Sequence, residues 1–237
     1  MEPTIVLVHG AFAESASWDG VVDALLDSGH PVIAVANPLR GLAADATAVS
    51  DVVSGVVGPV ILVGHSYGGA VITNVADVGD VIGLVYVAGF APAPGESCFT
   101  LAGEYPGSTL GDALEMTRRS DGTTDLRITA DRFHAQFAAD VPEAQAARMA
   151  VTQRPVTQEA LLEPSGERPL WKTCPSWFIF GEEDRNIPAA AMHHMAERAR
   201  AHRTVEIPGA SHAISVAHPL ATAHMIREAA ALRVVAS

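Results

Sequence analysis

The sequence predicts an α/β fold: a doubly wound, mostly parallel sheet of six strands with helices on both faces. Short runs of β-branched and other apolar residues alternate along the chain with segments whose apolar residues recur at helical spacing. The strand segments are almost continuously apolar, as expected for strands that are covered on both faces. Together these two observations favour a sheet with helical crossovers over an all-β or all-α arrangement.

The predicted core elements follow one another from the N-terminus. Gly29 after the first helical segment is suited to end a helix, and Pro188 stands where the fourth begins, a position at which its missing N–H costs nothing. Strands are expected at residues 4–8, 31–36, 60–63, 81–87, 176–180 and 204–207, and helices at 18–28, 42–57, 69–75, 189–201 and 220–232.

One long stretch, at about residues 96–169, interrupts this alternation. It contains no convincing strand and shows helical patterns at 130–139 and 143–151. A bare loop of this length is uncommon in a compact domain, so we expect a helical cap over the carboxyl edge of the sheet. The chain is then a single domain, residues 1–237, with the cap as an insertion.

Composition limits the classes of partner and cofactor. The chain has a formal net charge of −12, which argues against nucleic acid or an anionic membrane as partner because both attract basic surfaces. Lys172 is the only lysine, and no glycine-rich phosphate loop surrounds it. Cys98 and Cys174 stand alone, without the spacing of a disulfide framework or a zinc site. We therefore expect neither a metal nor a cofactor.

The N-terminus and the hydropathy pattern bear on location. The chain enters its first predicted strand without a charged segment and long apolar run of the signal-peptide type, and no apolar run reaches the length of a membrane span. We expect a cytoplasmic protein, as a monomer or a homodimer.

A candidate nucleophile lies at a strand-to-helix junction. The pentapeptide GHSYG at residues 64–68 follows an apolar strand and precedes a predicted helix. In this context the G-x-S-x-G pattern places its serine on a strained turn at the sheet edge, where the glycines permit close backbone contacts. The N-terminus of the following helix favours an anion at the same place. Ser66 is therefore the predicted nucleophile.

A serine nucleophile needs a base. Ten histidines are present, and His212 is favoured because it occupies a loop of small residues directly after the last predicted strand. The carboxyl end of that strand reaches the same sheet edge as Ser66.

The base in turn needs an acid that orients it. Three carboxylates follow the strand at 176–180, in the segment GEEDRNIP. Asp184 is preferred because its short side chain can be held by backbone N–H groups, and Glu183 is the alternative. The order Ser66, Asp184, His212 is the order of α/β-hydrolase triads.

Two backbone donors are needed for the oxyanion of an acyl-transfer reaction. The N–H of Tyr67, just after the serine, is one candidate. The other is expected from the turn after the first strand, where Gly10 allows a close approach. Ala11 is the preferred donor there, with Phe12 as the alternative if the register differs by one residue.

Four motifs in this order resemble the α/β-hydrolase superfamily over nearly the whole chain: LVHGAF, GHSYGG, GEEDRNIP and the SH of GASHA. Within it the chain is similar to the small cofactor-free esterases that include plant methyl esterases and hydroxynitrile lyases. The resemblance implies hydrolysis of a carboxylic ester through an acyl-enzyme. Because the strand before the HG motif begins at Thr4, we expect a reduced, six-stranded form without the two-stranded antiparallel start of larger members.

Three functions remain open for a chain with this predicted fold and these candidate site residues. Cleavage of a small, apolar ester is preferred, with Phe12, Phe133 and Phe137 expected to line the substrate pocket. A carbon–carbon lyase is the second reading, although the lysine that follows the catalytic histidine in those relatives is Ala213 here. The third is a ligand receptor of slow turnover on the same fold.

Overall fold

The computed structural model describes residues 1–76 and 79–232. In this part of the chain, six strands form one sheet in the order β2-β1-β3-β4-β8-β9, and every neighbouring pair is parallel. The strands are β1 (Thr4–Val8), β2 (Val32–Val35), β3 (Pro59–His65), β4 (Asp80–Val87), β8 (Ser176–Gly181) and β9 (Arg203–Ile207). All six predicted strands are therefore confirmed, with ends that differ by one or two residues.

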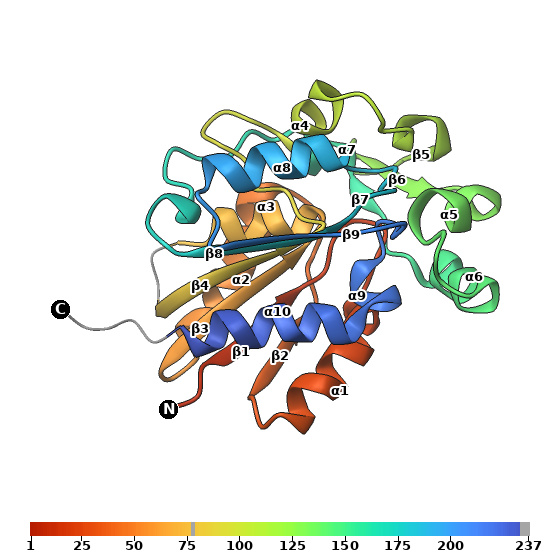
Figure 1. The fold of residues 1–237 in the computed structure, drawn as a ribbon. Helices are drawn as coiled ribbons and strands as arrows, with labels where there is room; N and C mark the ends of the chain where they lie inside the picture. The colour runs from red at the N-terminus through yellow and green to blue at the C-terminus, as the bar shows by residue number, and fades with distance from the viewer. Residues whose placement is uncertain (77–78, 233–237) are drawn as a thin grey trace.

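Helices cover both faces of this sheet, as Figure 1 shows. One face carries α1 (Asp19–Asp27), α9 (Ile214–Ala217) and α10 (Pro219–Ala231), and the other carries α2 (Leu42–Ser54), α3 (Tyr67–Thr73) and α8 (Ala189–Arg198). The strands β1, β3 and β8 are almost fully buried between these layers, which explains why their sequences are continuously apolar.

The strand register determines where the candidate motifs meet. Val8 at the end of β1 pairs with Gly64, and Val87 at the end of β4 pairs with His65. Because all strands run in the same direction, the turns after β1, β3, β8 and β9 open at one edge of the sheet. No helix in the described residues is long and apolar enough to cross a membrane.

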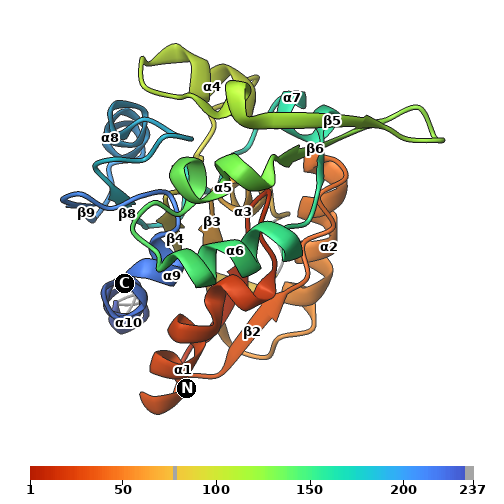
Figure 2. The same cartoon turned by 90° about the vertical axis from the view of Figure 1, so that its right-hand side faces the viewer.

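The cap between β4 and β8 differs from its prediction in one respect. Both expected helices are present, as α5 (Ala130–Phe137) and α6 (Glu143–Thr152), together with α4 (Cys98–Glu104) and α7 (Gln158–Leu162). The expectation that this stretch lacks strands was wrong, because β5 (Leu114–Arg118), β6 (Thr124–Ile128) and β7 (Val156–Thr157) form an antiparallel sheet. The hairpin of β5 and β6 extends outward from the molecule in Figure 2.

The sequence contained a weak signal for this hairpin. Leu114 and Met116 alternate with polar residues in β5, and Gly122 in the connecting turn has a φ of 90°, a conformation that glycine adopts without strain. Each of the two strands has five residues and only two apolar ones. An alternation of apolar and polar residues over so few positions does not distinguish a strand from a loop. The strand β7 is shorter still, and its pairing with β6 depends on contacts distant in sequence.

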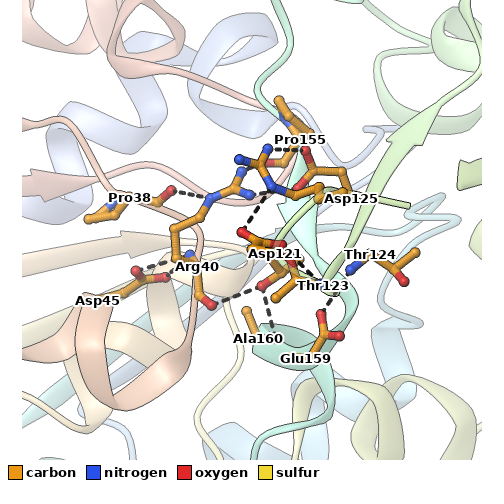
Figure 3. A network of polar contacts seen from close by, with 12 residues as sticks. Pro38, Arg40, Asp45, Asp121, Thr123, Thr124, Asp125, Pro155, Glu159 and Ala160 are labelled. Atoms are coloured by element: carbon orange, nitrogen blue, oxygen red, sulfur yellow. Dashed lines mark hydrogen bonds and ion pairs between the residues drawn. The ribbon is translucent and has the colours of Figure 1, made fainter. Parts of the chain in front are cut away.

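Arg40, in the loop before α2, links the core to the cap through hydrogen bonds (Figure 3). Its Nη1 lies 2.6 Å from Asp125 Oδ1 in β6, and its Nη2 donates to the carbonyl of Pro155 at 2.7 Å. The carbonyl of Arg40 accepts a hydrogen bond from Thr157 Oγ1 at 3.0 Å. The backbone N–H of the same residue donates to both oxygens of Asp45 at 3.1 Å. The small cap sheet is thus held against the loop that leads into α2.

Candidate active site

Ser66 occupies the sharp turn between β3 and α3. Its φ of 53° and ψ of −123° lie in a region that non-glycine residues rarely adopt. The surrounding glycines explain how the chain tolerates this turn. A Cβ at Gly64 would lie 2.5 Å from the carbonyl oxygen of Gly68, and a Cβ at Gly68 would lie 2.3 Å from the carbonyl oxygen of Val8. The serine is held by its own N–H, which donates to the carbonyls of Val87 and Ala88.

Asp184 and His212 form a buried pair at the same sheet edge. His212 Nδ1 lies 2.6 Å from Asp184 Oδ2, and the two side chains are 1% and 0% exposed. The other oxygen, Oδ1, accepts hydrogen bonds from the backbone N–H groups of Asn186 at 2.8 Å and Ile187 at 2.9 Å. A carboxylate held in this way places the proton of the imidazole on Nδ1 and leaves Nε2 free to act as a base. Glu183, the alternative acid, is exposed.

His65, which directly precedes Ser66, joins the nucleophile turn to the loop of His212. Its Nε2 donates to the backbone carbonyl of His212 at 3.0 Å, and the two rings lie 4.8 Å apart between centroids. Burial lowers the pKa of His65 to about 3, so this ring stays neutral at physiological pH. His65 could not be assigned a role from the sequence, because nothing in the motif indicates where its ring points.

The turn after β1 approaches Ser66 from the other side. A Cβ at Gly10 would lie only 2.6 Å from Ser66 Cβ, so the close approach expected of this glycine is present. No hydrogen bond from the backbone N–H of Ala11 or Phe12 to a protein acceptor is present among residues 1–76 and 79–232. Tyr67 is the first residue of α3, so its N–H has no acceptor within the helix. Unpaired backbone donors next to a serine are what an oxyanion site requires.

The side chain of Tyr67 is fixed by a buried acid. Its hydroxyl donates to Asp45 Oδ2 at 2.8 Å, and Asp45 is fully buried beneath it. Burial raises the pKa of the Asp45 carboxyl and raises the pKa of the Tyr67 hydroxyl. Asp45 could not be identified from the sequence, because nothing in the pattern distinguishes it from Asp51 in the same helix.

A cavity of about 580 Å³ opens over Ser66, between the core and the cap. No Asp, Glu, Lys, Arg or His is among the described residues that line it. Its aromatic walls come from Phe12, Tyr67, Phe90, Phe99 and Tyr105. Cap strands and helices supply its aliphatic walls: Leu110, Leu114, Met116, Leu126, Leu161 and Leu162. The cavity suits an uncharged, largely apolar ligand.

Two of the three predicted pocket residues lie elsewhere. Phe12 lines the cavity, but Phe133 and Phe137 do not. Both are almost fully buried, and their rings stack with centroids 5.1 Å apart. They are four residues apart in α5, so they share the helix face that turns towards the core rather than the face towards the cavity. Phe137 contacts His212 instead, with ring centroids 4.9 Å apart.

In the described residues no group of His, Cys, Asp and Glu side chains is arranged to hold a metal ion. The two cysteines are buried and unpaired with each other.

The family described as "Alpha/beta hydrolase family" matches residues 5–225. A carbendazim hydrolyzing esterase of Nocardioides sp. (strain SG-4G) is 36% identical over 110 residues, a match that covers 40% of this chain and 46% of that esterase. The matched region is therefore less than half of that relative.

Solved structures share the fold over nearly the whole chain. The pyrethroid hydrolase PytH superposes with a TM-score of 0.76 at 24% identity, covering 96% of this chain and 97% of that one. Polyneuridine aldehyde esterase superposes with a TM-score of 0.79 at 18% identity, covering 96% and 99%. At these identities the similarity establishes the fold and leaves the substrate open.

Proposed function

Because the chain belongs to the alpha/beta hydrolase family, we propose that it is a serine hydrolase that cleaves the carboxylic ester of a small, neutral and apolar molecule. One observation carries the proposal: Ser66 lies on a strained turn beneath an apolar cavity, at the sheet edge where Asp184 and His212 form a buried pair. The name of the similar carbendazim hydrolyzing esterase, and that of the pyrethroid hydrolase that shares the fold, support a hydrolytic reaction.

The proposed reaction follows the serine triad. Ser66 Oγ attacks the ester carbonyl while His212 Nε2 takes its proton, and Asp184 stabilises the resulting imidazolium through Nδ1–H. The oxyanion is stabilised by the N–H of Tyr67 and by one from the turn at Ala11 and Phe12, each worth on the order of 3 kcal/mol. The imidazolium protonates the leaving alcohol, and a water deprotonated by His212 then releases the acid from the acyl-enzyme.

The lyase reading finds no support in the cavity. A cationic side chain would be needed near the departing anion, and the described lining contains none. Ala213 follows the histidine, and the lone lysine, Lys172, lies in the segment before β8, at the end of that strand opposite the catalytic turns.

The test is covalent labelling followed by turnover. A nitrophenyl phosphonate should add one phosphonyl group to Ser66, located by peptide mass spectrometry, and nitrophenyl esters from acetate to decanoate should be hydrolysed. Ser66→Ala should abolish both reactions, whereas Ser54→Ala, which changes an exposed serine of α2, should leave both unchanged. Absence of labelling and of turnover in the unmodified protein would contradict a serine hydrolase.

A further inference from the structure

The last three residues of α5 contact both catalytic loops, although they belong to the cap. Ala135, Gln136 and Phe137 are consecutive, and each makes a separate contact with the loop of Asp184 or the loop of His212. Figure 2 shows α5 standing in front of the carboxyl edge of the sheet. These contacts are distinct from the walls of the cavity, which includes none of the three residues.

Gln136 holds the loop of the acid. Its Nε2 donates to the carbonyl of Arg185 at 2.8 Å and to Asn186 Oδ1 at 2.9 Å, while its Oε1 accepts from Thr109 Oγ1 at 2.9 Å. The carbonyl of Arg185 can only accept, so the orientation of the Gln136 amide is determined. The next N–H along the loop, that of Asn186, is one of the two that hold Asp184 Oδ1. The amide thus fixes the turn that aims the carboxylate.

Arg185 adds a second link from the same loop. Its Nη1 donates to the backbone carbonyl of Ala135 at 3.2 Å, one residue before Gln136. The backbone N–H of Thr109 also donates to the carbonyl of Arg185, at 3.0 Å. The acid loop is therefore bound to α5 through Ala135 and Gln136, and to a second part of the cap through Thr109.

Phe137 holds the loop of the base. Its ring meets His212 edge to face, with centroids 4.9 Å apart and planes at 77°, and it also meets His65 with centroids 6.0 Å apart. The hydroxyl of Ser211 donates to the carboxylate of Asp140, which follows α5, and its Oγ lies 3.4 Å from the backbone carbonyl of Phe137. Ser211 directly precedes His212, so the ring of the histidine is restrained by Phe137 and its backbone by the end of α5 together with Asp140.

We propose that Gln136 and Phe137 are positioning residues for the reaction. These two residues at the end of α5, which we call the brace, hold the loop of Asp184 and the loop of His212 in the geometry that the reaction needs. This inference rests on the proposed function, because it assigns the two residues a role in the same triad. Packing of Phe137 against His212 also keeps water away from the hydrogen bond to Asp184, which strengthens that bond in its low-dielectric surroundings. The cap then governs the rate of the chemistry as well as the shape of the cavity.

Phe137→Leu and Phe133→Leu make a matched pair for the test. Both remove a buried aromatic ring from α5, but only Phe137 contacts His212. We expect Phe137→Leu to lower kcat for acetate and octanoate esters by the same factor, on the order of 10- to 100-fold, because a small misplacement of a catalytic group has effects of this size. KM should change little and the acid limb of the pH–rate profile should move. Phe133→Leu should lower the melting temperature while kcat and the pH profile stay unchanged.

Gln136→Met examines the acid loop with a side chain of similar length that lacks the amide donors. It should lower the rate of phosphonylation of Ser66 and kcat together, again with one factor for short and long esters. The proposed positioning role would be rejected if Phe137→Leu and Gln136→Met both kept the wild-type kcat and pH–rate profile and only lowered the melting temperature. A change confined to long esters would reject it too, because it would make these residues determinants of specificity.

A measurement without turnover separates this inference from the proposed function. In the Ser66→Ala protein, the imidazole of His212 can be titrated by nitrogen NMR with and without Phe137→Leu. We expect the second substitution to shift the midpoint and to broaden or remove the Nδ1 proton signal. Failure of phosphonate labelling in the wild type would reject the serine hydrolase alone, whereas identical His212 titrations would reject the brace alone.

Discussion

The hydrogen bond between Asp184 and His212 spans 2.6 Å and is closed to solvent on both sides. Oδ1 of Asp184 accepts hydrogen bonds from two backbone N–H groups, and Oδ2 accepts one from the imidazole of His212. These contacts determine the rotamer of Asp184 and the tautomer of His212. They therefore also predict how an asparagine at position 184 would orient its amide.

Asp184→Asn should reduce kcat/KM by about 10⁴-fold. The N–H groups of Asn186 and Ile187 would retain the amide oxygen, so the amide NH₂ would face His212 Nδ1 and force that nitrogen to accept. His212 Nε2 would then carry the proton and could not take one from Ser66. Steady-state kinetics with a nitrophenyl ester measure the loss, and Glu183→Gln, at an exposed neighbour, is the control. A larger loss at Glu183 would move the acid by one residue.

Gly10→Ala should impair folding stability and activity together. The new methyl group would lie 2.6 Å from Ser66 Cβ and 2.7 Å from the carbonyl oxygen of His65, so the turn after β1 must move away from the nucleophile. We expect a loss of about 1–3 kcal/mol in the free energy of unfolding, measured by urea denaturation, and a lower kcat from the displaced oxyanion donors. Gly55→Ala, whose methyl group would meet no atom closer than 3.5 Å, should affect neither.

Stability should fall as the pH drops below about 6.5. Burial lowers the pKa of His65 to about 3 and that of His9 to about 4, from 6.5 in the unfolded chain. Between these values the unfolded chain binds more protons, so each histidine contributes a slope of up to about 1.4 kcal/mol per pH unit, with full stability above 6.5. The slope is measured by denaturation from pH 4 to 8.

The matched variants for this pH effect are His65→Gln and His224→Gln. The first removes one buried titrating ring and should flatten the slope between pH 4 and 6.5. The second changes an exposed histidine of α10 and should leave the slope as it is. An unchanged slope in His65→Gln would mean that this ring already takes up its proton in the folded state.

Phe99→Ala should change which esters are preferred. Phe99 lies on α4 at the rim of the cavity and is 66% exposed, so its loss removes apolar wall with little effect on stability. We expect the ratio of kcat/KM between octanoate and acetate esters to fall severalfold, in line with the 1–3 kcal/mol that one methylene can contribute in an apolar pocket. Val151→Ala, an exposed change on α6 outside the cavity, is the control. Equal ratios in the two variants would place the acyl chain elsewhere.

The features that depend on short stretches of chain could be predicted from the residues. The alternation of apolar strands and helices predicts the sheet, and the spacing of Gly64, Ser66 and Gly68 predicts the strained turn, because local sterics allow few other conformations there. The positions of Asp184 and His212 at strand ends follow from the same order, since parallel strands deliver their carboxyl ends to one edge.

The features that depend on pairing between distant parts of the chain could not be predicted in this way. The strands of the cap find each other through contacts such as Asp125 with Thr157, and Arg40 meets Asp125 across 85 positions of sequence. The helical pattern of α5 predicts that Phe133 and Phe137 share a face, but it does not say whether that face meets a cavity or His212. Only the placement of α5 against the catalytic loops decides this, because what a helix face touches depends on the elements packed against it.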